Sequence, residues 1–120
     1  MFFKEIINWY KIFSSLEEGI NRIPFNRAID MNVGGKKICI ANTKEGLFAI
    51  QAKCPHNGFP LSNGMCTDDI AIVCPVHRYR FDLKTGRAKS GLGDAGWVYP
   101  IEIRENGVYL GIKSTKFSLF

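Results

Sequence analysis

Two short turns in this chain each carry one cysteine and one histidine. The first is Cys54-Pro55-His56, and the second, after a gap of seventeen residues, is Cys74-Pro75-Val76-His77. The chain therefore offers two thiolates and two imidazoles from two loops. This is the donor set of a [2Fe–2S] centre in which two histidines replace two cysteines on one iron. It requires a fold that presents both loops side by side.

Zinc is the main alternative, because two cysteines and two histidines also form a common structural zinc set. Zinc turns usually place two to four residues between paired ligands, since both must point at one ion. Cys54 and His56 have only one residue between them, a separation that favours two different metal atoms. In a binuclear cluster both cysteines can bind one iron and both histidines the other. We therefore favour iron–sulfur, with zinc, copper and a coincidental pattern as alternatives.

Size and composition predict one globular domain spanning residues 1–120. Hydrophobic residues make up 46% of the chain, which is ordinary for a folded protein. No run approaches the roughly eighteen apolar residues of a membrane helix. Charges at Lys4 and Glu5 interrupt the N-terminus too early for the apolar region of a signal peptide. We expect a cytoplasmic protein without membrane association.

The remaining two of the four cysteines are expected to stay reduced, because the cytosol disfavours disulfides. Cys39 lies in an apolar, strand-like run, where a buried thiol acts as a small hydrophobe. Cys66 lies in a turn region. We expect it to be packed or idle, with a role as ligand or redox thiol as the lesser alternative.

The net charge of +5 does not predict nucleic-acid binding, because lysines and arginines are scattered singly and form no basic run. Some positive charge gathers near the second turn, at Arg78, Arg80, Lys84 and Arg87. These residues form either a solvated rim or a docking surface for an acidic partner. Arg80 and Lys84 are our candidates for docking.

Short β segments separated by turn residues dominate the chain, which predicts an antiparallel sandwich or small barrel. Gly34-Gly35 and Asn106-Gly107 predict two-residue hairpin turns, and residues 42–46 predict a longer hairpin loop. Ser15, Glu18 and Gly19 together predict at most one helical turn. We expect strands at residues 9–13, 29–33, 37–41, 47–52, 70–73, 79–82, 101–104 and 108–112.

Both ligand turns lie in loops that leave a predicted strand, over about residues 53–64 and 74–86. A β scaffold can therefore present them together. A third, Gly-rich stretch at residues 90–96 could cover the site or serve as a plain connector.

Three segments together resemble the Rieske [2Fe–2S] family: Cys54-Pro55-His56-Asn57-Gly58-Phe59-Pro60-Leu61, Cys74-Pro75-Val76-His77 and Phe81-Asp82-Leu83-Lys84-Thr85-Gly86. The closest likeness is to soluble Rieske-type ferredoxins and the small subunit of assimilatory nitrite reductase, from about Trp9 to Gly111 and including Tyr99-Pro100-Ile101. The resemblance implies an all-β fold of three sheets, a Rieske-type antiparallel β-sandwich with a cluster-binding subdomain made of the two ligand loops. By position, Cys54 and Cys74 would hold the inner iron, and His56 and His77 the outer iron, from which electrons leave.

Two departures from the family pattern stand out. The family usually has glycine directly after the second histidine, where it permits a positive φ or a close backbone approach; here the residue is Arg78. High-potential Rieske proteins of respiratory complexes also carry a disulfide between their ligand loops. The corresponding residues are Phe59 and Val76, so this chain cannot form that bond.

The functional expectation is a one-electron carrier and not an enzyme. The chain has no phosphate-binding fingerprint and no histidine besides His56 and His77, which excludes a histidine general base and a complete ring-hydroxylating oxygenase subunit. The resemblance implies a carrier of electrons from a reductase to a terminal oxygenase. The alternatives are a small electron-transfer subunit bound to a nitrite reductase large chain and, in another class, a zinc-stabilised structural module.

The same resemblance predicts the reduction potential. Hydrogen bonds to the cluster sulfurs stabilise the reduced form and raise the potential. High-potential relatives place serine and tyrosine hydroxyls there, whereas this chain has Tyr79 and Phe81. We expect a potential of roughly −150 mV, near the low end of the Rieske range. A redox titration that gives a value well above zero would contradict this.

Overall fold

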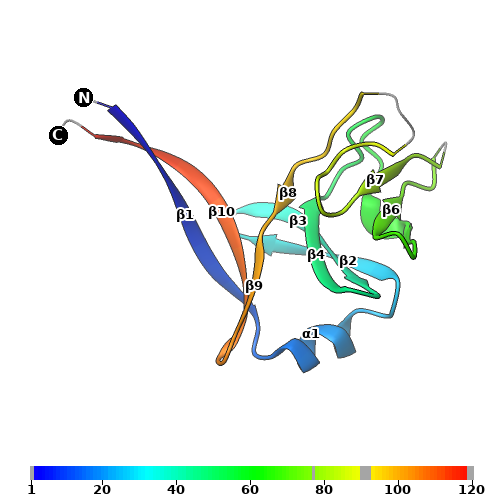
Figure 1. Ribbon diagram of the computed structural model, residues 1–120, viewed down its shortest axis with the longest axis horizontal. Coiled ribbons are helices and arrows are strands. Elements are labelled where there is room, and N and C mark those ends of the chain that lie inside the picture. The colour runs from blue at the N-terminus through cyan, green and yellow to red at the C-terminus, as the bar shows by residue number, and fades with distance from the viewer. Residues whose placement is uncertain (1, 77, 90–92, 119–120) are drawn as a thin grey trace.

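The computed structural model describes residues 2–76, 78–89 and 93–118. It consists mainly of antiparallel strands in three sheets (Figure 1), which confirms the predicted all-β class. The strand orders are β1-β10-β9, β2-β3-β4-β8 and β5-β6-β7. The strands are β1 (Phe2–Phe13), β2 (Arg27–Val33), β3 (Lys36–Thr43), β4 (Gly46–Gln51), β5 (Met65–Cys66), β6 (Ala71–Val73), β7 (Arg80–Asp82), β8 (Val98–Tyr99), β9 (Ile101–Arg104) and β10 (Gly107–Ser118).

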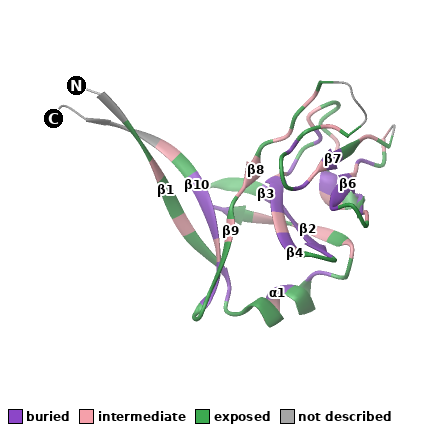
Figure 2. Ribbon diagram, in the orientation of Figure 1, coloured by how far each residue is buried: buried purple, intermediate pink, exposed green. Residues whose placement is uncertain are grey.

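The central strands β3 and β4 of the four-stranded sheet contribute buried residues to two cores, one on each face. Successive side chains of a strand point to opposite faces, and from Ile38 onward every residue of β3 is buried. Ile38 and Ile40 belong to the core that the sheet shares with β1 and β10. Cys39 and Ala41 belong to the core of the cluster subdomain. Figure 2 shows this concentration of buried residues along β3 and β4.

The predicted hairpins form, with two differences in their turns. Gly34 and Gly35 connect β2 and β3 with φ of 55° and 81°, as a two-residue turn with two positive φ values requires. The 42–46 loop is tighter than predicted, because Thr43 already pairs with Gly46. The last turn lies one residue earlier than predicted, since Gly107 pairs with Arg104. Gly107 instead permits close packing: a Cβ there would lie 2.6 Å from the carbonyl oxygen of Phe13.

The first and last strands are much longer than predicted. They pair from Phe2 and Ser118 inward to Phe13 and Val108. Figure 1 shows that they leave the body as a twisted two-stranded ribbon on the side away from β6 and β7. Residues 4–8 of this ribbon are exposed or half-buried, so the alternation of apolar and polar residues that marks a strand is weak there. The sequence prediction missed the extension for this reason.

The helix α1 (Leu16–Arg22) is longer than the single turn predicted from Gly19. Gly19 does not end the helix. It lies inside it, where a Cβ would come within 2.8 Å of Phe13 and 2.9 Å of Leu47. The predicted N-terminal cap is present, and Ser15 Oγ accepts a hydrogen bond from the Glu18 N–H at 3.0 Å. The other helical segment is a 3₁₀ turn, η1 (Leu61–Asn63). Within the described residues, no helix has the length and apolarity needed to cross a membrane.

Ser15→Ala tests the importance of this cap. Removing the only side-chain acceptor at the N-cap should lower the free energy of unfolding by about 1 kcal/mol, measured by urea denaturation of the cluster-loaded protein. Ser14→Ala is the matched control, because Ser14 contributes its backbone N–H to Glu18 and not its hydroxyl. Equal losses in the two variants would contradict a specific role for the Ser15 hydroxyl.

Candidate metal centre

The first ligand loop follows β4 and is closed by backbone hydrogen bonds. The Cys54 N–H donates to the Phe59 carbonyl, and the Gly58 N–H donates to the Cys54 carbonyl, both at 2.8 Å. Asn57 Oδ1 accepts from the Phe59 N–H at 2.9 Å, which tightens the turn. The result is a loop with two sides: Cys54 is 3% exposed, whereas the His56 side chain is 37% exposed.

The second ligand loop joins β6 to β7. The Cys74 N–H donates to the Tyr79 carbonyl at 2.8 Å, and Cys74 is completely buried. Arg78 has a φ of +56°, so this position does adopt the left-handed conformation for which the family uses glycine. His77 lies outside the described residues, and its ligand role stays a prediction.

The structure brings the two loops together at their cysteines. A Cβ at Gly64, where the first loop ends, would lie 1.9 Å from the carbonyl oxygen of Val73, so only glycine permits this contact directly before Cys74. Burial raises the pKa of the Cys74 thiol, and the adjacent Cys54 thiol raises it further. The Val76 N–H and the Asn57 side chain act on the Cys74 pKa in the opposite direction.

His56 is held by neighbours that come from two other segments. The ring of Tyr79 packs edge-on against the imidazole, with 4.3 Å between centroids and an interplanar angle of 63°. Asp94 Oδ2 lies 3.2 Å from His56 Nδ1. Asp94 belongs to the Gly-rich stretch that we predicted could cover the site. Residues 90–92 of that stretch are outside the described residues, but at Asp94 it contacts the first loop.

Sequence reasoning did not identify Asp94 or Asn57 as residues of the site. Asp94 is a single carboxylate in a Gly-rich segment, 38 residues from His56, and carries no motif of its own. Asn57 is adjacent to His56, but its approach to Cys74 in the other loop depends on how the loops pack.

A match to a known family model identifies the family. A family model described as the Rieske [2Fe-2S] domain matches residues 8–95. The chain belongs to the Rieske [2Fe–2S] family. It is therefore an electron-transfer protein with a Rieske-type cluster, whose ligands are two cysteines and two histidines.

Individual relatives agree with this family. The chain is 30% identical over 90 residues to the biphenyl dioxygenase ferredoxin subunit of Pseudomonas sp. (strain KKS102), covering 74% of this chain and 83% of the relative. Among solved structures it resembles the ferredoxin of carbazole 1,9a-dioxygenase from Nocardioides aromaticivorans IC177, with 18% identity, a TM-score of 0.71 and coverage of 85% and 95%. It also resembles a structure described as an NADH-dependent nitrite reductase small subunit from Mycobacterium tuberculosis, with 15% identity, a TM-score of 0.73 and coverage of 95% and 99%.

The described donors fit the inner half of a Rieske cluster. Cys54 and Cys74 supply two adjacent buried thiols, and His56 lies on the more exposed side of the same site. The thiolate is the species that binds metal. Burial raises the pKa of the Cys74 thiol, and cluster binding requires its thiolate form.

The other two cysteines are packed thiols, as predicted. Cys39 is completely buried and Cys66 is 6% exposed, and all four cysteines are unpaired in the structure. Burial raises the pKa of Cys66 to about 11 and that of Cys39 further above its usual range. Neither thiol is therefore a ready nucleophile near neutral pH.

Two of the basic residues near the second loop, Arg80 and Lys84, have acidic neighbours. Arg80 lies 3.8 Å from Asp69, and Lys84 lies 2.8 Å from Glu45. Much of their charge is thus compensated within the chain, which weakens both as candidates for docking. Their role with a partner stays a prediction.

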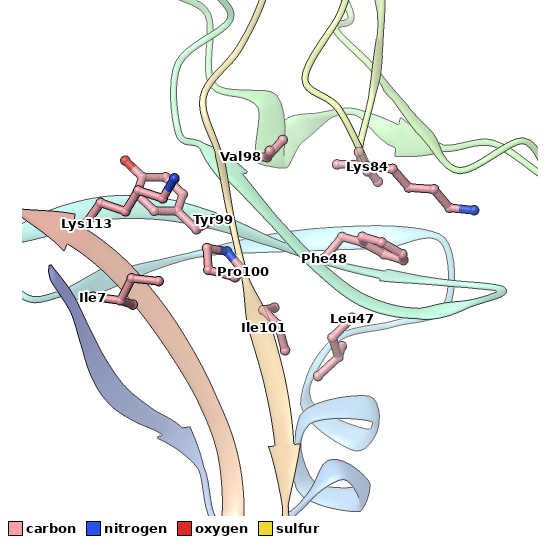
Figure 3. A pocket seen from close by; sticks show the side chains of 10 residues that line it. Ile7, Leu47, Phe48, Lys84, Val98, Tyr99, Pro100, Ile101 and Lys113 are labelled. Atoms are coloured by element: carbon pink, nitrogen blue, oxygen red, sulfur yellow. The ribbon is translucent and has the colours of Figure 1, made fainter. Parts of the chain in front are cut away.

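A groove lies apart from the candidate metal site. It has a volume of about 550 Å³ and lies between the β1–β10 ribbon and the four-stranded sheet (Figure 3). Apolar residues such as Phe48 and Pro100 line it together with two lysines. Lys84 pairs with Glu45, and Lys113 lies 3.6 Å from Glu5. Among the described residues that line it, none is a cysteine or histidine.

Asn57→Asp tests hydrogen bonding to a ligand sulfur. Asn57 Nδ2 lies 3.8 Å from Cys74 Sγ, and aspartate removes this donor but keeps the acceptor for the Phe59 N–H. A lost hydrogen bond of about 0.5–1.5 kcal/mol corresponds to a potential lower by about 20–60 mV for one electron, and the new negative charge adds to the decrease. A redox titration measures the decrease in potential. Asn32→Asp, with the same charge change on β2, is the control and should leave the potential unchanged; equal shifts would contradict the role of Asn57.

Proposed function

We propose that this chain is a Rieske ferredoxin that carries electrons, one at a time, from a reductase to a terminal oxygenase. Cys54, His56, Cys74 and His77 are the proposed ligands. The observation that carries this proposal is the meeting of two buried thiols from separate loops, with His56 on the exposed side. The cluster, when bound, supplies reversible one-electron oxidation and reduction.

The two sides of the site suit this role. The buried cysteines keep one end of the site away from water, which limits unwanted reactions with solvent. The exposed edge of His56 lets a partner protein approach within a short distance of the ligand imidazole. Tyr79 and Asp94 orient that imidazole from two sides. Both histidines of this chain are proposed ligands, so neither is free to act as a general acid or base. The proposal therefore assigns catalysis to the partner.

An oxygenase system is favoured over a nitrite reductase by the level of identity. The relative at 30% identity is named as the ferredoxin subunit of a dioxygenase. The nitrite reductase likeness is at 15% identity and supports the shared fold alone. We also propose that residues 1–120 work as one domain, because the first and last strands, β1 and β10, pair along their length in one sheet.

Ligand variants test the proposed site. Cys54→Ser and His77→Cys should each lose or alter the Rieske EPR signal of the dithionite-reduced protein, because each removes a proposed cluster ligand. Cys66→Ser is the matched control: Cys66 is also buried but is not a proposed ligand, so its variant should keep the signal. A wild-type spectrum from either ligand variant would remove that residue from the ligand set.

Electron transfer tests the proposed partners. The oxygenase component of a biphenyl dioxygenase system should reoxidise the reduced protein, which is measured by the return of the oxidised visible spectrum. The protein should also purify from its native cells without a permanently bound large chain. Stable co-purification with a nitrite reductase large chain would overturn the carrier role and favour the subunit alternative.

A further inference from the structure

A groove next to the second ligand loop combines two arginines with apolar residues. Its volume is about 440 Å³, and its lining includes Arg27 at the start of β2, Arg78 in the ligand loop, and Met65 and Pro75 between them in sequence. Met65 is 55% exposed. None of its described lining residues is acidic, so we call it the arginine groove.

The two arginines differ from the other basic residues near the site. Arg80 and Lys84 have acidic neighbours, whereas within residues 2–76, 78–89 and 93–118 no carboxylate lies within ion-pair distance of Arg27 or Arg78. The arginine groove therefore holds two uncompensated positive charges over a partly apolar surface. Such a surface attracts carboxylates, and each guanidinium can bind one through two parallel hydrogen bonds.

Arg78 is placed there at a cost to the backbone. Its φ of +56° is unfavourable for any residue with a Cβ and favourable for glycine. The side chain is exposed, and within the described residues it makes no ion pair that would offset this strain. A contact between the guanidinium and a partner molecule would account for an arginine at this position.

We propose that an acidic segment of the redox partner docks in the arginine groove, with carboxylates on Arg27 and Arg78 and an apolar side chain against Met65. This rests on the proposed electron-carrier function. Arg78 directly follows the predicted ligand His77 in sequence, so a partner bound there contacts the loop from which electrons leave. Methionine suits such a contact because its flexible side chain adapts to different apolar groups.

The test measures binding of a defined probe, a rhodamine-labelled peptide of six glutamates around one leucine, by fluorescence anisotropy at low salt. R27E/R78E should weaken binding to the cluster-loaded protein by at least tenfold. K36E/K37E is the control at the opposite end of the β2–β3 hairpin, since Lys36 pairs with Val33 while Arg27 pairs with Asn42. Each replacement removes two charge units, so both double variants fall from +5 to +1. The control should bind like the wild type, and equal weakening in the two double variants would overturn the proposal.

A milder variant separates binding from folding. Arg78→Gly should relieve the backbone, so that the melting temperature stays equal or rises, and yet weaken peptide binding several-fold. Unchanged peptide affinity in this variant would overturn the role of Arg78. A nucleic acid is the other class of acidic partner, and a labelled thymidine oligonucleotide tests it. If the oligonucleotide bound more tightly than the peptide, and if only R27E/R78E lost this binding, the protein-partner proposal would be overturned.

The EPR spectrum of each variant distinguishes this proposal from the proposed function. An intact Rieske signal with unchanged peptide binding in R27E/R78E rejects the arginine groove alone. Absence of the Rieske signal from the wild-type protein rejects the electron-carrier function itself.

Discussion

Burial of the central strand β3 on both faces of the four-stranded sheet is the constraint on which the structure depends. The sheet β5-β6-β7 has strands of only two or three residues, too short to be stable by themselves. It is stable here because side chains such as Cys39 and Ala41 from β3 enter its core, while Ile38 and Ile40 on the opposite face join the core against β1 and β10. The ligand loops are thus attached to a rigid base through one strand that serves two cores.

The same arrangement makes the candidate metal site asymmetric. Cys54 and Cys74 point into the core, where burial raises the pKa of Cys74 and excludes water. His56 comes from the same short turn as Cys54 but lies on the outside, against Tyr79 and Asp94. One residue between Cys54 and His56 is enough to turn these two proposed ligands to opposite sides of a loop. A short motif therefore produces both a protected inner end and an outer end that a partner can reach.

The sequence predictions were correct where neighbouring residues determine the structure and wrong where contacts between distant residues determine it. The Gly34-Gly35 turn was predicted correctly, because two adjacent glycines determine a tight turn without help from the rest of the chain. The position of the last hairpin turn was wrong by one residue, because Gly107 is required by its contact with Phe13 in β1. The helix was predicted too short for a similar reason: Gly19 packs against Phe13 and Leu47 and does not end it.

The sequence by itself determined the family of this protein and its proposed ligands: two pairs of cysteine and histidine at spacings that suit two iron atoms, in loops between strands. This was possible because ligand identity and spacing are local properties of the chain. Only the tertiary structure decided which groups surround those ligands, such as Asp94 beside His56, Asn57 beside Cys74 and the two arginines of the arginine groove. These contacts join residues far apart in sequence, and they exist only because the packing of the sheets brings separate loops within a few ångströms of one another.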